Sequence, residues 1–154
     1  MNENEFRVIV RGATGSPEDW AQALRAAPSD LPSLTEEEKE RASRFKWDQN
    51  DYARRKLLDE IAEQKWKQRG HQLARRIQEV LKPLESEYRL EGVFAEVPKS
   101  RWTARFASRK GLSDIHLDDD FVQDLLDFNA LEDSEKLRRK LLVGLGEERY
   151  LVSR

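Results

Sequence analysis

A long helical segment, predicted from about residue 35 to residue 82, most constrains how this chain can fold. Thr35 and Glu38 form a T-x-x-E capping box, in which each side chain can bond a backbone amide at the start of the helix. Pro83 limits the other end, because proline lacks an amide proton and disfavours helix in the residue before it. Between these limits the segment contains no proline and one glycine, Gly70.

Apolar spacing indicates that this segment is two helices rather than one. The four polar residues 48–51 favour caps and turns, and the apolar residues before them follow a different helical register from those after them. We therefore expect helices at about 35–47 and 51–82, with a single continuous rod as the alternative. The second helix carries an apolar stripe at steps of three and four residues, formed by Leu58, Ala62, Trp66, Gly70, Leu73, Ile77, Val80 and Leu84.

The segment before the long helices predicts one strand and one short helix. Residues 6–12 are rich in β-branched side chains and end at a glycine, which favours a strand. Ser16 followed by Pro17 is a typical helix start, so a helix is expected at about 17–27.

Alternating side chains after the long helices predict a β-hairpin, with strands at 88–97 and 101–109. A two-residue loop at 99–100 would place Val93, Ala95 and Val97 on one face with Trp102, Ala104 and Phe106. Since Lys-Ser is not a favoured turn pair, a longer loop stays open. The opposite face would then carry Arg101, Thr103, Arg105 and Arg109.

The acidic run near residue 118 permits two interpretations. Asp114, His116, Asp118 and Asp120 would lie on one side of a strand, where a hard divalent cation could bind. We favour the alternative, in which Asp118 caps a helix, because no calcium-loop glycine and no His/Glu pair at helical spacing is present. No metal site is therefore predicted.

The last part of the chain predicts one further helix and a short strand. Asp133 or Ser134 would cap a helix at 134–144, and residues 149–152 would add a final strand. Together these elements predict an α+β fold, with a small, mostly antiparallel sheet packed against long amphipathic helices. The sheet would consist of the hairpin at about 88–109 and the N-terminal strand, in a single domain spanning 1–154.

Composition restricts the classes of function. The 154 residues include no cysteine, which excludes disulfides, thiolate metal sites and cysteine nucleophiles. No apolar run approaches the length of a membrane span, and the acidic start does not resemble a secretory signal, so we expect a cytoplasmic protein without membrane contact. The two histidines, His71 and His116, lie in different elements and no catalytic motif is evident. We expect no enzyme activity and no cofactor.

The net charge of −2 conceals strong segregation of charge along the chain. Residues 99–110 contain five basic side chains and no acidic one, and this concentration suggests a nucleic-acid-binding face formed by Arg101, Arg105, Arg109 and Lys110. Two observations weigh against it: the isoelectric point is near 5.8, and the cations of the long helix alternate with acids. Nucleic-acid binding is therefore kept as the alternative function.

The favoured function is non-catalytic protein–protein interaction, of an adaptor, regulatory or assembly kind. Long helices that expose arginine and tryptophan suit such surfaces. Trp47 lies on neither apolar stripe, and we expect it to contact a partner together with Arg54 and Arg55, whereas Trp66 should belong to the core. The alternative for Trp47 is packing against the loop at 28–33. The partner's identity is not predicted, and self-association through the stripe at 58–84 stays open.

Overall fold

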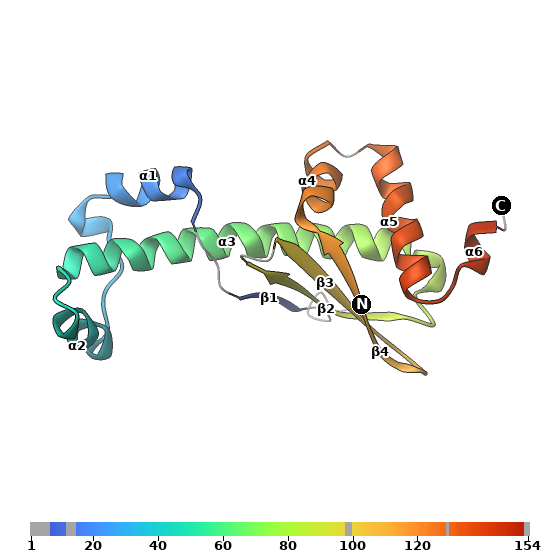
Figure 1. The fold of residues 1–154 in the computed structure, drawn as a ribbon, viewed down its shortest axis with the longest axis horizontal. Coiled ribbons are helices and arrows are strands. Elements are labelled where there is room, and N and C mark those ends of the chain that lie inside the picture. The colour runs from blue at the N-terminus through green and yellow to red at the C-terminus, as the bar shows by residue number, and fades with distance from the viewer. Residues whose placement is uncertain (1–6, 12–14, 98–99, 129, 153–154) are drawn as a thin grey trace. The chain divides into compact units, whose positions relative to one another are not determined.

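The computed structural model describes residues 7–11, 15–97, 100–128 and 130–152. It confirms the α+β fold, with one four-stranded sheet and helices that include a single long one (Figure 1). The strands are β1 (Arg7–Arg11), β2 (Arg89–Glu96), β3 (Arg101–Ser108) and β4 (Gly111–Asp118). The α-helices are α1 (Pro17–Arg25), α2 (Glu36–Arg44), α3 (Gln49–Val80), α4 (Asp119–Phe128), α5 (Leu131–Gly144) and α6 (Arg149–Val152), with 3-10 turns at Pro28–Asp30 and Lys82–Leu84.

The chain divides into two compact units. Residues 1–12 and 66–154 form what we call the sheet unit, and residues 13–65 form the helical unit. Helix α3 contributes residues 49–65 to the helical unit and residues 66–80 to the sheet unit. The two predicted long helices are confirmed, because α2 ends at Arg44 and α3 begins at Gln49.

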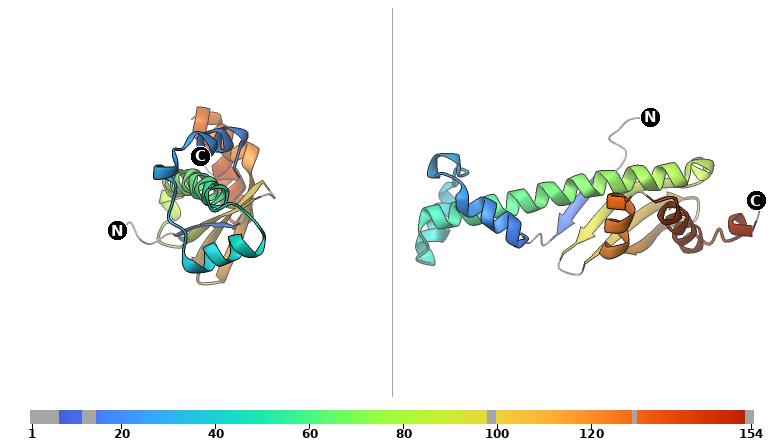
Figure 2. Two further views of the ribbon diagram at one scale, coloured as in Figure 1. Left: turned by 90° about the vertical axis from the view of Figure 1, so that its left-hand side faces the viewer. Right: turned by 90° about the horizontal axis from the view of Figure 1, so that it is seen from above.

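The sheet has strand order β1-β2-β3-β4, in which β1 is parallel to β2 and the other pairs are antiparallel. Its inner face carries the apolar side chains predicted for the hairpin and forms the main core, with Trp102 and Phe106 as the largest members. Within the sheet unit, α4 and α5 contact β4 (Figures 1 and 2). Trp66 of α3 packs on Trp102.

Close contact between α3 and the sheet depends on Gly70. A Cβ atom at this position would lie 2.3 Å from Val8 Cγ1 and 3.3 Å from the Trp102 ring. The single glycine of the long helix is therefore the point at which β1 and β3 approach the helix backbone.

The hairpin loop is longer than two residues. Glu96 pairs with Arg101, which leaves four residues, 97–100, between the strands. Lys99 of the predicted two-residue turn lies outside the described residues. Since the register differs from the predicted one by two positions, the predicted side chains that lie in the strands keep their faces. Val97 and Arg109 were predicted as strand residues and lie in turns instead.

Strand β4 was not predicted as a strand. Ile115 and Leu117 face the core, and Asp114 and His116 face away from it. The predicted helix follows directly, with Asp119 and Asp120 in the first turn of α4.

Two predictions for the C-terminal region are wrong. Helix α5 begins at Leu131, and its N-cap, Ala130, makes no side-chain capping bond. Residues 149–152 form helix α6 instead of a strand, because Tyr150 N donates to Glu147 O (3.1 Å) and Leu151 N donates to Glu148 O (2.9 Å). Arg138 Nη2 also donates to Tyr150 O (3.2 Å), which ties this turn to α5.

Among the described residues, no helix is both long enough and apolar enough to cross a membrane. The same residues include no group of three or more His, Cys, Asp or Glu side chains arranged to hold a metal ion.

Candidate functional site

The helical unit has a core of small side chains. Its buried apolar residues are Leu58 and four alanines, at positions 23, 42, 53 and 62. Four large apolar side chains of the same unit are exposed instead: Trp20 is 39%, Trp47 50%, Leu24 62% and Phe45 65% exposed. Most large apolar side chains of a small unit are normally buried, so this reversal marks the surface of the helical unit as unusual.

Helix α1 is anchored at its first turn. Ser16 N donates to Asp19 Oδ2 (3.0 Å), and Asp19 N donates to Ser16 Oγ (3.2 Å), which completes a capping box. Lys65 of α3 donates to the buried Asp19 carboxylate. Burial acts to raise the pKa of Asp19, but the bonds from Lys65 and Ser16 outweigh it and hold the pKa below its ordinary value.

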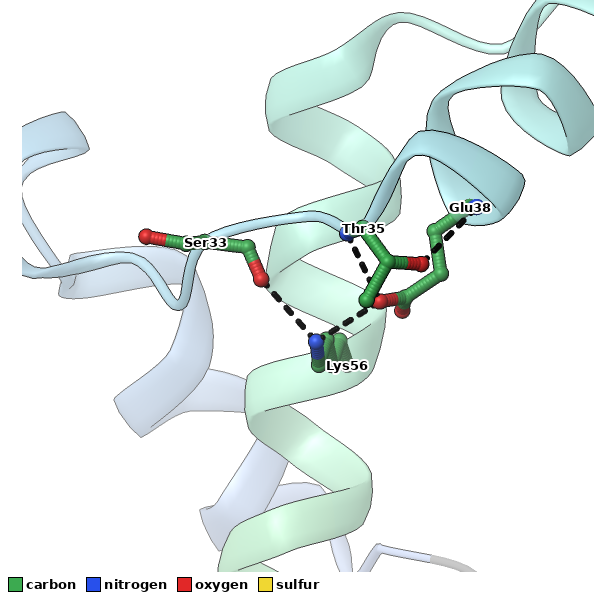
Figure 3. Close-up of polar contacts among 4 residues, drawn as sticks. All are labelled: Ser33, Thr35, Glu38 and Lys56. Atoms are coloured by element: carbon green, nitrogen blue, oxygen red, sulfur yellow. Dashed lines mark hydrogen bonds and ion pairs between the residues drawn. The ribbon is translucent and has the colours of Figure 1, made fainter.

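Helix α2 is joined to α3 through a second capping box. Thr35 N donates to Glu38 Oε1 (3.0 Å), and Glu38 N donates to Thr35 Oγ1 (3.1 Å). Lys56 Nζ on α3 then donates to the same Glu38 oxygen (2.8 Å) and to Ser33 O (2.9 Å), as Figure 3 shows. The capping box predicted from the sequence therefore also fixes α2 to α3.

The hydrogen bond from Lys56, with help from the Thr35 amide, lowers the pKa of Glu38 from 4.5 to about 2. A carboxylate with a depressed folded-state pKa contributes stability that is complete above its unfolded pKa and is lost as the pH falls through the folded one. The Glu38 contribution should therefore be complete above about pH 4.5 and disappear near pH 2.

We expect Glu38→Gln to lower the free energy of unfolding near neutral pH, with a difference from the wild type that vanishes between about pH 4.5 and 2. Urea unfolding at several pH values measures this difference. Glu37→Gln, an exposed neighbour in the same helical turn, is the matched control and should change stability little. A Glu38→Gln deficit that persists unchanged at pH 2 would contradict the assigned role of the carboxylate.

Trp47 lies just after α2, where the chain reverses direction. Lys46 has φ 57°, and Trp47 N donates to Ala42 O (2.8 Å), so the helix ends in a Schellman motif. The Trp47 ring makes an edge-to-face contact with Tyr52, with ring centroids 6.1 Å apart. Trp47 is thus held at the end of the helix while half of its surface stays in solvent.

Arg55 connects the surface of α3 to α1. Its guanidinium lies over the Trp20 ring, 5.6 Å from the centroid, and its Nε is 3.6 Å from Asp59 Oδ1. Tyr52 and Arg55 are three residues apart, so they are neighbours on the helix surface. We call the set Trp47, Tyr52, Arg55 and Trp20 the aromatic strip; it consists of two contacting pairs, Trp47 with Tyr52 and Arg55 with Trp20. Leu24, four residues after Trp20 on α1, extends it.

Arg54 lies beside the strip, and its contacts differ from those of Arg55. Its Nη1 is 3.4 Å from Asp51 Oδ1, and its buried Nε has no hydrogen-bond acceptor within the described part of the chain. No hydrogen bond, ion pair or ring contact between described residues joins Trp47 directly to Arg54 or Arg55. Of the three predicted residues, Trp47 and Arg55 therefore belong to the strip, through contacts with Tyr52 and Trp20 that were not predicted, and Arg54 has no such ring contact among the described residues.

The four basic residues of the alternative function are divided between two places. Arg101 and Arg105 lie on the outer face of β3, as predicted, whereas Arg109 and Lys110 lie in the turn between β3 and β4. The expectation that no acid opposes them is wrong for the strand arginines. Arg105 makes a bidentate pair with Asp114 (2.8 and 3.1 Å), and Arg101 Nε is 3.0 Å from Glu96 Oε2.

The pair formed by Arg105 and Asp114 shifts the pKa values of both groups. The hydrogen bond between Arg105 and Asp114 raises the pKa of the guanidinium and lowers that of the carboxyl. Arg105 also lies over the Phe94 ring, 5.0 Å from its centroid, and Thr103 Oγ1 is 2.9 Å from His116 Nδ1. On β3 and β4 the outer face thus carries paired charges, and Arg101 and Arg105 are not unpaired cations.

Comparison with protein-family models, with curated proteins and with solved structures finds no match to this chain.

Proposed function

We propose that this chain is a non-catalytic protein–protein interaction protein, of an adaptor, regulatory or assembly kind. The proposed partner-binding surface is the aromatic strip with Leu24 and Arg54 beside it. The proposal rests on one observation: the helical unit buries alanines and exposes its tryptophans.

Physical arguments favour a partner on this surface. Tryptophan, tyrosine and arginine are the side chains that most often dominate binding energy at protein interfaces, and the strip consists only of these types. Their mutual contacts hold them in fixed positions before binding, so little conformational entropy is lost when a partner covers them. Arg54, which is one-quarter exposed, offers further guanidinium donors to a partner carboxylate at the edge of the strip.

The stripe at 58–84 is a weaker candidate for self-association. Leu58, Ala62, Leu73 and Ile77 are all buried within the chain, which leaves little of this stripe for a second copy. Homo-oligomerisation therefore stays a prediction that sedimentation measurements must address separately from the strip.

We expect the double variant Trp20→Ala/Trp47→Ala to lose a specific partner in pull-downs from native lysate while retaining its fold. Both side chains are only partly buried, so each substitution should lower the free energy of unfolding by less than the roughly 3–5 kcal/mol of a fully buried aromatic side chain, and circular dichroism checks that the fold is retained. Partners are identified and quantified by mass spectrometry against wild-type bait.

The matched control is Phe128→Ala/Leu131→Ala, which removes two strongly exposed apolar side chains from the sheet unit. Parallel arms with nuclease and with higher salt test the nucleic-acid alternative, in which recovery should fall steeply as salt rises. Equal recovery of the partner on wild type and Trp20→Ala/Trp47→Ala bait would refute the proposed surface.

A further inference from the structure

The sheet unit contains a polar recess whose border does not include Arg101 or Arg105. It has a volume of ≈ 520 Å³ and is bordered by the β3–β4 turn, by the segment that leads into β2 and by the start of α6. These three segments bring together the cations Arg109, Lys110 and Arg149. The three segments are far apart in the sequence, and the fold brings them together.

One carboxylate of the recess already has its own partners. Glu147 is buried, and its Oε1 accepts a 2.6 Å hydrogen bond from Tyr88 Oη, while its Oε2 is 3.0 Å from Arg149 Nε. The bond from Tyr88 holds the pKa of Glu147 below its ordinary value, and the same bond raises the pKa of Tyr88 to about 12. Arg149 is therefore largely committed to Glu147, and the recess keeps two other cations.

Arg109 and Lys110 are the cations that remain. Both are exposed, and among the residues that the structure describes neither side chain forms an ion pair within 4.0 Å, although the Lys110 charge acts at longer range to lower the pKa of Glu147. Their turn is fixed from within: Lys110 N donates to Ser108 Oγ (3.2 Å), and Gly111 takes the left-handed backbone (φ 109°) that closes it. In this respect they differ from Arg101 and Arg105, which carboxylates of the sheet already satisfy.

We propose that this recess binds the phosphate group of a small phosphorylated molecule. A guanidinium and an ammonium next to each other supply several charge-assisted donors to a tetrahedral dianion, and the Ser86 hydroxyl at the border can add another. The site is a single hollow rather than a track of cations, which favours a small ligand over the backbone of a nucleic acid. This site is independent of the aromatic strip.

Substitution of Glu87 should change the phosphate affinity in the opposite direction from substitution of the two cations. It borders the recess, its side chain is exposed, and its negative charge opposes an anion. Glu87→Gln should therefore strengthen phosphate binding, whereas Arg109→Gln/Lys110→Gln should weaken it. A structural role for the turn would not produce opposite effects from these two changes.

The experiment titrates the full chain with inorganic phosphate and pyrophosphate at constant ionic strength, followed by calorimetry and by the amide NMR signals of residues 108–111. We expect Arg109→Gln/Lys110→Gln to lower the affinity at least about tenfold, the effect of losing one charge-assisted hydrogen bond. Glu87→Gln should raise it several-fold. Lys136→Gln/Arg139→Gln, which removes two exposed cations of α5 outside the recess, should leave it unchanged.

Three results would overturn the proposal. The first is an equal loss of affinity in the α5 control, which would indicate general charge attraction. The second is no response of the amides of residues 108–111 to either anion, with Glu87→Gln also silent. The third is tighter binding of a single-stranded oligonucleotide at matched phosphate concentration with a steep salt dependence, which would assign these cations to a polyanion surface.

Discussion

Trp102→Ala is expected to lower the free energy of unfolding by about 3–5 kcal/mol, the range for removing a buried aromatic side chain. Trp102 is fully buried near the start of β3, and its ring packs on Trp66 with centroids 5.2 Å apart. The alanine variant would leave a cavity where α3 meets the sheet, because the Gly70 backbone lies directly above and offers no side chain to fill it.

A polar contact adds to this loss. Trp102 Nε1 donates to Asp119 Oδ1 (3.0 Å) at the start of α4, so the variant also removes a hydrogen bond to a carboxylate. Trp102→Phe is the informative control, since it keeps an aromatic ring but not the donor and should lose less stability. Urea unfolding followed by circular dichroism measures both variants. A loss below about 1 kcal/mol for Trp102→Ala would show that this core does not depend on the ring.

Leu58→Ala is expected to destabilise the helical unit by about 2–5 kcal/mol. Among its described residues, Leu58 is the one large side chain that is fully buried, and the other buried apolar positions are alanines. Its terminal atoms lie against Gly15, where an added Cβ would be 2.2 Å from Leu58 Cδ1.

Hydrogen exchange distinguishes this effect from general destabilisation. In Leu58→Ala, amides of α1 and α2 should exchange faster, while those of β2 and β3 should keep most of their protection. Leu24→Ala removes the same side chain from an exposed position of the same unit and should change stability by no more than about 0.5 kcal/mol. Faster exchange confined to the sheet would contradict the assignment of Leu58 to the helical core.

Local signals in the sequence predicted the helical segment well. The capping box at Thr35 and Glu38 and the polar run at 48–51 place the start of α2 and the break before α3. Both signals act between residues close in the chain, so no tertiary information was needed. The alternation in the hairpin likewise predicted which side chains face the core, because a shift of two residues preserves the faces.

Features that depend on tertiary neighbours were not predicted. The polar residues Asp114 and His116 made strand β4 hard to recognise in the sequence. The strand is stabilised by its pairing with β3, which the sequence does not show. The pairing of Arg105 with Asp114 follows from the same register, which is why the strand arginines seemed unopposed in the sequence. In the helical unit, sequence analysis selected Trp47 but missed Trp20 and Tyr52, although the three-residue spacing of Tyr52 and Arg55 was an available signal.

The central claim is that a partner covers the aromatic strip, and footprinting of the tryptophans by hydroxyl radicals tests it most directly. Trp20 and Trp47 are exposed in the isolated chain, the exposed Phe128 of the sheet unit serves as the reference for radical dose, and the buried Trp102 reports that the fold is intact. We predict that Trp20 and Trp47 react in the purified protein and become protected when the same chain is placed in native lysate, with Trp102 unreactive in both. Equal reactivity of Trp20 and Trp47 in the two conditions would show that no partner covers the aromatic strip.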